Sequence, residues 1–131
     1  MIYLYAMLRS FLFVGIGGAA GSMARFGLGY IISRNITAAF PFGTFTINIL
    51  GSFIIGMLAG LGMKYQWLQG QHTGWLLLAT GFCGGFTTFS SFAYENISLI
   101  QRGQYLTPML YTALSIVTGF ILCFAGMRLF K

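Results

Sequence analysis

The sequence predicts an all-α integral membrane protein that crosses the bilayer four times. Of its 131 residues, 57% are hydrophobic and only 6% are charged, whereas about a quarter of a soluble domain is charged. A chain with so few charges cannot cover a water-facing surface, so most of its exterior must face lipid. Its 19 glycines fit the same class, because glycine is commoner in membrane helices than in soluble ones.

Four stretches are long and apolar enough to cross a membrane, which takes about 20 mostly apolar residues. They lie at about Leu8–Ile32, Gly43–Met63, Gly74–Ile100 and Thr107–Leu129. The connections are too short for an extramembrane domain, so we expect residues 1–131 to form a single four-helix transmembrane domain. We interpret the first stretch as a retained helix, because it is too long for a signal peptide and contains Arg25.

The third stretch contains a segment that is poorly suited to a straight helix. Gly84 and Gly85 are followed closely by Thr87, Thr88, Ser90 and Ser91. Glycine adds backbone freedom, and Ser and Thr compete for backbone hydrogen bonds. We therefore expect a break near Gly84–Thr88, and expect valine at Gly84 to resist the backbone angles that a break needs. The alternative is a packed helix that is only kinked.

Open backbone inside a membrane is tolerated where it is buried in protein or lines a water-filled cavity. The carbonyl groups of a broken helix are natural ligands for a hard cation such as Na⁺.

The charges are sparse and almost all basic. Seven basic residues and one acidic residue, Glu95, give a net charge of +6. The basic residues are scattered singly, which argues against nucleic-acid binding. They serve either as anchors at the membrane surface or as a field that attracts anions.

The basic residues are divided almost evenly between the two sides of the membrane, so they favour neither orientation strongly. With four spans, both termini lie on one side, which carries Arg9, Lys64, Arg128 and Lys131. The other side carries Arg34, Arg102 and, if it reaches that interface, Arg25. Because this bias is so small, two copies could insert in opposite directions and pair as an antiparallel two-fold dimer.

Polar side chains recur at helical spacing in the second and fourth stretches. They are Thr44, Asn48 and Ser52 in the second, and Tyr111, Ser115 and Thr118 in the fourth. These side chains supply hydroxyl and amide donors, whereas a cation pathway normally shows rings of carboxylates. The pattern favours an anion pathway, although Asn48 could instead bond to a neighbouring helix.

Aromatic rings and one arginine add to this pattern. Phe86, Phe89 and Phe92 recur every third residue, either as ordinary packing residues or with their positive ring edges facing an anion. Arg25 lies inside the first apolar stretch. It either reaches back to the membrane surface or supplies a vestibule charge that attracts anions.

The residues that an enzyme would need are missing. One acidic residue and one histidine, His72, provide no acid–base pair, triad or metal cluster. The two cysteines form no CxxC pair. A small proton-coupled multidrug exporter of four helices is the alternative function. It would need a central carboxylate, and Glu95 lies toward the end of the third stretch, so the roles of Glu95 and His72 stay open.

Three motifs together resemble the Fluc/CrcB family of bacterial fluoride channels. They are Gly17–Arg25, Gly43–Asn48 and Gly84–Phe92, and with the chain length they extend the resemblance over essentially the whole sequence. The resemblance implies a dual-topology homodimer in the bacterial inner membrane. It implies that cytoplasmic fluoride leaks out passively through two antiparallel pores.

The family resemblance also implies roles for individual residues. Backbone carbonyls of Gly84 and Thr87 from each subunit would hold a structural Na⁺ at the dimer centre. The fluoride path would be lined by Phe89, Phe92, Asn48, Thr44, Ser91, Tyr111 and Ser115. Some members carry a further hydroxyl residue where Gly119 stands, which leaves the far end of the fourth-helix track open.

Overall fold

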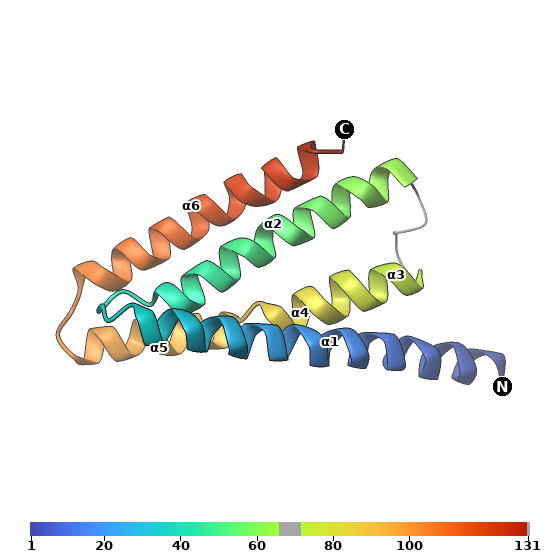
Figure 1. The fold of residues 1–131 in the computed structure, drawn as a ribbon, viewed down its shortest axis with the longest axis horizontal. Helices are drawn as coiled ribbons and strands as arrows, with labels where there is room; N and C mark the ends of the chain where they lie inside the picture. Colours follow the sequence, from blue (N-terminus) through green and yellow to red (C-terminus); the bar gives the residue numbers. More distant parts are fainter. Residues whose placement is uncertain (66–71, 131) are drawn as a thin grey trace.

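The computed structural model describes residues 1–65 and 72–130. Within these ranges it contains four helices long and apolar enough to cross a membrane: Tyr3–Asn35, Phe42–Tyr65, Thr73–Gln101 and Leu106–Arg128. The N-terminus, the end of the second helix and the C-terminus lie at the same end of the molecule (Figure 1). The prediction of an all-α chain with four helices of membrane-spanning length is confirmed.

The individual elements divide the third span into four pieces. In chain order they are α1 (Ile2–Asn35), α2 (Phe42–Tyr65), α3 (Thr73–Trp75), the π-helix η1 (Leu76–Cys83), α4 (Gly84–Phe86), α5 (Phe89–Gln101) and α6 (Leu106–Arg128). The first helix starts several residues before the predicted Leu8. Three glutamines of the predicted polar connection, Gln66, Gln69 and Gln71, and the basic Lys131 lie outside the described residues.

Helix α1 packs against η1 and α4 at backbone contact distance. A Cβ added at Gly17 would lie 2.0 Å from the carbonyl oxygen of Leu77, and one added at Gly21 would lie 2.1 Å from that of Phe82. From the other side, a Cβ at Gly85 would lie 2.4 Å from a carbonyl oxygen of α1. Only glycine fits at such distances, as is typical of close helix pairs in membranes.

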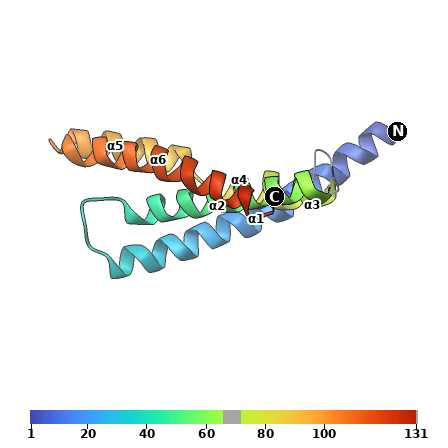
Figure 2. The ribbon, with the colours of Figure 1, turned by 90° about the horizontal axis from the view of Figure 1, so that it is seen from above.

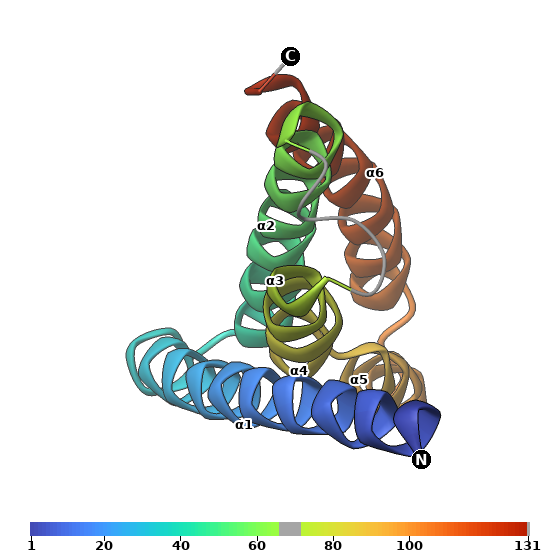
Figure 3. The ribbon, with the colours of Figure 1, turned by 90° about the vertical axis from the view of Figure 1, so that its right-hand side faces the viewer.

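Helices α2 and α6 form a second close pair, seen side by side in Figure 3 with α1 crossing below them. A Cβ at Gly56 would lie 2.1 Å from the carbonyl oxygen of Cys123, and one at Gly126 would lie 2.4 Å from that of Phe53. Helix α2 also contacts η1, α4 and α5, and its polar face reaches Thr88.

The third span leaves the helical conformation at two threonines. Thr87 (φ −82°, ψ 158°) and Thr88 (φ −151°, ψ 116°) are extended, a conformation that β-branched residues favour. Gly84 has φ −63° and ψ −38°, which is ordinary right-handed helix. The expectation that Gly84 needs unusual backbone angles is therefore wrong.

Candidate ion pathway

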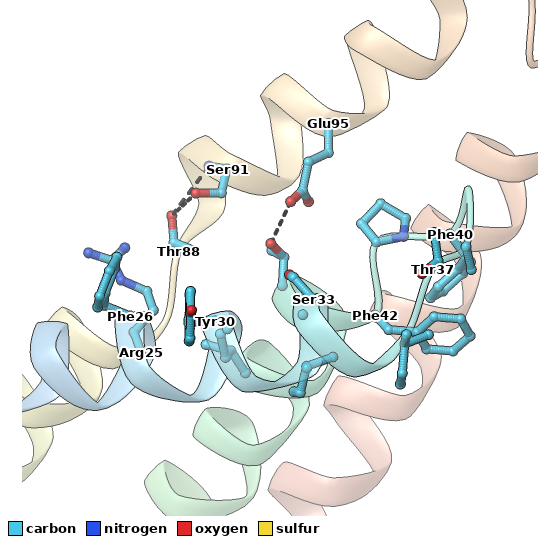
Figure 4. Close-up of a pocket in the computed structure, with 18 of the residues that line it drawn as sticks. Arg25, Phe26, Tyr30, Ser33, Thr37, Phe40, Phe42, Thr88, Ser91 and Glu95 are labelled. Atoms are coloured by element: carbon cyan, nitrogen blue, oxygen red, sulfur yellow. Dashed lines mark hydrogen bonds between the residues drawn. The ribbon is translucent and has the colours of Figure 1, made fainter.

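A large open pocket of about 830 Å³ lies between α1, α2 and α5. We call it the Arg25 pocket. Its polar lining comes from separate elements: Ser22, Arg25, Tyr30, Ser33, Thr37, Thr44, Thr88, Ser91 and Glu95. Figure 4 shows Arg25 on α1 below Thr88, with Ser91 and Glu95 above on α5. The fold thus brings three of the predicted site residues, Arg25, Thr44 and Ser91, to one cavity.

Glu95 is held in the wall of this pocket by two hydroxyl donors. Thr44 Oγ1 donates to Glu95 Oε1 at 2.6 Å, and the Tyr111 hydroxyl donates to Oε2 at 2.8 Å. Tyr111 is fully buried, and its ring centroid lies 4.9 Å from that of Phe92. Sequence reasoning left Glu95 without a role. Its position four residues after Ser91, and so on the same helix face, was the signal available.

Thr88 is the second site residue that sequence reasoning did not single out. Its hydroxyl caps α5 by accepting a hydrogen bond from the Ser91 N–H at 3.3 Å, and it donates to Ser91 Oγ at 3.1 Å. Because Ser91 Oγ accepts in that second bond, the Ser91 hydroxyl proton stays available to an ion in the pocket.

Asn48 clamps the extended segment from α2. The Thr88 N–H donates to Asn48 Oδ1 at 2.8 Å, and Asn48 Nδ2 donates to the Thr88 carbonyl oxygen at 3.0 Å. Asn48 therefore bonds across to a neighbouring segment, one of the two roles expected for it. An amide side chain carries an acceptor oxygen and a donor nitrogen on separate atoms and so matches both groups of one peptide residue, whereas an ionised carboxylate can only accept.

These bonds release two backbone carbonyl groups. In a continuous α-helix each carbonyl accepts from the N–H four residues later, so Gly84 would pair with Thr88 and Thr87 with Ser91. The Thr88 N–H donates to Asn48 Oδ1 instead, and the Ser91 N–H donates to Thr88 Oγ1. The carbonyls of Gly84 and Thr87 thus lose their helical partners to side-chain acceptors.

A second pocket, of about 430 Å³, shares Thr88 with the first. We call it the Gly84 pocket, and it is also lined by Asn48, Thr87 and Phe89. A Cβ added at Gly84 would meet nothing within 4 Å, so the space in front of this glycine is open. The two released carbonyl groups belong to residues that line this pocket.

The remaining predicted residues lie apart from the Arg25 pocket. Phe89 is 79% exposed, and its ring centroid lies 5.7 Å from that of the half-buried Phe92. Tyr111 does not line the Arg25 pocket but contacts two residues that do, Glu95 and Phe40. Ser115 lines neither of the two pockets. A single chain therefore gathers part of the predicted pathway and leaves Phe89 on its surface.

Comparison with known proteins places this arrangement in a family. The model of the family described as "CrcB-like protein, Camphor Resistance (CrcB)" matches residues 12–127. The chain belongs to the CrcB family. The resemblance carried by the three sequence motifs is thereby confirmed.

Curated CrcB relatives match over most of the chain and bear the name "Fluoride-specific ion channel FluC". The one from Gloeothece citriformis is 48% identical over 92% of this chain and 95% of its own length. That from Azobacteroides pseudotrichonymphae is 46% identical over 86% and 89%, and one from Thermus thermophilus is 42% identical over 93% and 95%. These relatives are named as channels, which agrees with the prediction that the chain is not an enzyme.

Proposed function

We propose that this chain forms a fluoride-selective channel that lets fluoride leave the cytoplasm passively and so lowers its toxicity. The observation that carries the proposal is the Arg25 pocket within a CrcB chain whose relatives are named fluoride-specific channels. Fluoride holds its water tightly, so a pore must replace that shell with donors while binding weakly enough to release the ion. Arg25 and Ser91 offer such donors, and Thr44 and Tyr111 offer theirs in exchange with Glu95.

The proposed path runs from the Arg25 pocket along α5 and α6. Phe89, Phe92, Asn48, Thr44, Ser91, Tyr111 and Ser115 line it. The positive ring edges of Phe89 and Phe92 would face the ion. Support comes from the ring contacts that join Phe89 to Phe92 and Phe92 to Tyr111, which make a continuous track from the surface to the buried donor.

Two copies of the chain in opposite orientations would complete the pathway. The exposed ring of Phe89 and the open Gly84 pocket support a partner on this face, and the small charge bias permits both orientations. Such an antiparallel homodimer would be a multi-pass protein of the bacterial inner membrane. Reporter fusions at the C-terminus should show both orientations, and a wild-type chain found in only one would contradict the proposal.

A structural Na⁺ is proposed at the interruption between α4 and α5, held by the carbonyls of Gly84 and Thr87 from each copy. The described residues contain no group of three or more His, Cys, Asp or Glu side chains suited to a metal, so the ligands would be backbone oxygens. Hard monovalent cations accept carbonyl ligands, and the two released carbonyls fit this donor set. Bound there, the ion would supply a fixed positive charge that holds two copies together.

The decisive experiment is ion efflux from liposomes that contain the purified protein. Fluoride should leave quickly and chloride hardly at all, with efflux falling when Na⁺ is exhaustively replaced by a large organic cation. No Na⁺ current should accompany fluoride. Exchange of drug cations for protons, without fluoride efflux, would favour the exporter instead.

A further inference from the structure

The first two turns of α1 extend beyond the rest of the helical bundle. Helix α1 has 34 residues, against 24 in α2 and 23 in α6. At about 1.5 Å per residue it is roughly 51 Å long, whereas the hydrocarbon core of a bilayer is about 30 Å thick. Figures 1 and 2 show the N-terminal end of α1 projecting past its neighbours.

The projecting segment, Met1–Leu8, is apolar and uncovered. Exposed fractions are 92% for Tyr3, 56% for Leu4, 74% for Tyr5 and 51% for Leu8. Among the described residues, no hydrogen bond or ring contact joins positions 1–5 to another helix. The CrcB match begins only at residue 12, so the family's shared architecture does not account for this segment.

Basic residues mark the level of the membrane surface at this end. Arg9 Nη2 donates to Thr73 Oγ1 at 2.9 Å, and its guanidinium lies 5.7 Å from the ring centroid of Phe13. Lys64 lies near a tyrosine ring at the end of α2, and Arg128 near a phenylalanine ring in the last turn of α6. Basic and aromatic side chains of this kind gather where the chain meets lipid headgroups.

No internal acid neutralises these cations. Glu95 is the only carboxylate side chain of the chain, and it lies near the opposite end of the third span, bonded to Thr44 and Tyr111. No acidic side chain of this protein therefore supplies a counter-charge at the Arg9 end. The phosphate groups of acidic lipids are anions that lie at the right depth.

We propose that Met1–Leu8 is an interfacial anchor that lies in the headgroup layer of an acidic membrane, with Arg9 binding lipid phosphate beside it. Standing straight, this segment would carry its exposed tyrosines and leucines about 12 Å beyond Arg9 into water. Tilting α1 buries them at the boundary between headgroups and acyl chains, where tyrosine is favoured. The lipid-facing side of α1 already continues this surface through Leu8, Leu12 and Ile16, which line one apolar groove.

The proposal is tested with nitroxide labels on Leu4→Cys and Met7→Cys, which leave Tyr3 and Tyr5 unchanged. The two native cysteines are first replaced by alanine, so that only the introduced cysteine is labelled. In phosphatidylglycerol vesicles both labels should collide more with oxygen, which enters lipid, than with a water-soluble nickel complex. In phosphatidylcholine vesicles the equilibrium between the lipid-bound and water-exposed segment should shift toward water by about fivefold for each basic residue involved, and the collision ratio should fall with it. Arg9→Gln should cause a similar fall in acidic vesicles.

The matched control is Arg34→Gln, in the last turn of the same helix, which should leave the ratio unchanged. Three results would overturn the anchor. Nickel collisions that dominate in acidic vesicles would mean that the segment stands in water. Labels shielded from both reagents would mean that a second copy or another protein covers the segment. An oxygen-to-nickel collision ratio that is the same in acidic and neutral vesicles would mean that Arg9 does not bind lipid phosphate.

Discussion

The third span is held in two different ways on the two sides of Thr87. Upstream, η1 and α4 touch α1 backbone to backbone, with glycine at each point of closest approach. Downstream, α5 is attached by hydrogen bonds: Asn48 bonds its leading residue Thr88, and Thr44 and Tyr111 bond Glu95. Close backbone packing accepts no added atom, whereas a hydrogen-bonded group can change partners at a modest net cost.

This difference separates a closely packed structural unit, α1 with η1 and α4, from α5, whose polar side chains take part in the proposed ion pathway. The α1–η1–α4 unit fixes where the third span lies, and α1 also contributes Ser22, Arg25 and Ser33 to the Arg25 pocket. The α5 segment carries donors and acceptors that could exchange a protein partner for an ion. Mutations at the close glycine contacts upstream of Thr87 should therefore act on folding, and mutations of the polar side chains around α5 should act on conduction.

The largest effect should come from Gly85, which is adjacent to Gly84 but packed on the other side. Gly85→Val places a branched side chain where even a Cβ lies 2.4 Å from the backbone of α1, so we expect a loss of about 3 kcal/mol or more and little monodisperse protein. Gly84→Ala, where a Cβ meets nothing within 4 Å, is the matched control. Each Gly84→Ala chain should fold like the natural one, but the dependence of fluoride efflux on Na⁺ concentration should change. Equal yields of both variants would contradict the packing described for α4.

The next largest effect should come from Asn48. Asn48→Leu removes both bonds to Thr88 and leaves a peptide N–H and a carbonyl without partners, at a cost of about 1–3 kcal/mol for each group. The start of α5 should shift, and fluoride efflux should fall by at least about tenfold. Ser52→Ala, one turn away on α2, loses only a bond to its own helix and should change efflux little. A fast Asn48→Leu channel would show that the clamp is dispensable.

The sequence was enough to predict the four spans, because long apolar runs with few charges have one stable outcome in a bilayer. The polar stripe of α2 was also readable, since Thr44, Asn48 and Ser52 are spaced by four. The residues at which the third span leaves the helical conformation could not be predicted from the sequence. Glycine at position 84 predicted unusual backbone angles there, yet Gly84 is helical. The extended residues are Thr87 and Thr88.

Long-range partners explain what the sequence concealed. Asn48 meets Thr88 from 40 positions away, and Thr44 meets Glu95 from 51 positions away. No pattern within the third stretch predicts that the side-chain amide of Asn48 replaces a backbone carbonyl as the acceptor for the Thr88 N–H. Glu95 consequently looked peripheral, although its two donors make it part of the Arg25 pocket.

A smaller effect should distinguish Phe89 from Phe92. Phe89 is 79% exposed, so Phe89→Ile should leave stability unchanged while slowing fluoride efflux, if its ring edge meets the ion. Phe92→Ile should slow efflux too, and it should also cost about 0.5–1.5 kcal/mol, because its ring packs against Tyr111. Thermal unfolding and efflux measured together separate the two roles. Normal efflux from both variants would return the rings to ordinary packing.

The smallest effect should appear within one pair of neighbouring serines. Ser91 lines the Arg25 pocket, and its hydroxyl proton is available because Thr88 Oγ1 donates to Ser91 Oγ. Ser90 is exposed and lines neither pocket, although its hydroxyl also lies 3.3 Å from Thr88 Oγ1. Ser91→Ala removes one neutral donor, worth about 0.5–1.5 kcal/mol, so efflux should fall by roughly two- to tenfold. Ser90→Ala should leave it unchanged.

The serine pair also tests the division at Thr87. Both serines lie downstream, in the first turn of α5, so folding should be the same in the two alanine variants and only conduction should differ. Ser91→Thr, which keeps the hydroxyl, should restore most of the fluoride efflux. If Ser91→Ala lowers the unfolding temperature as much as it lowers efflux, and Ser91→Thr restores neither, then Ser91 serves mainly to hold the Thr88 cap. The donors in the pocket would then have to be Arg25 and the hydroxyl groups other than that of Ser91.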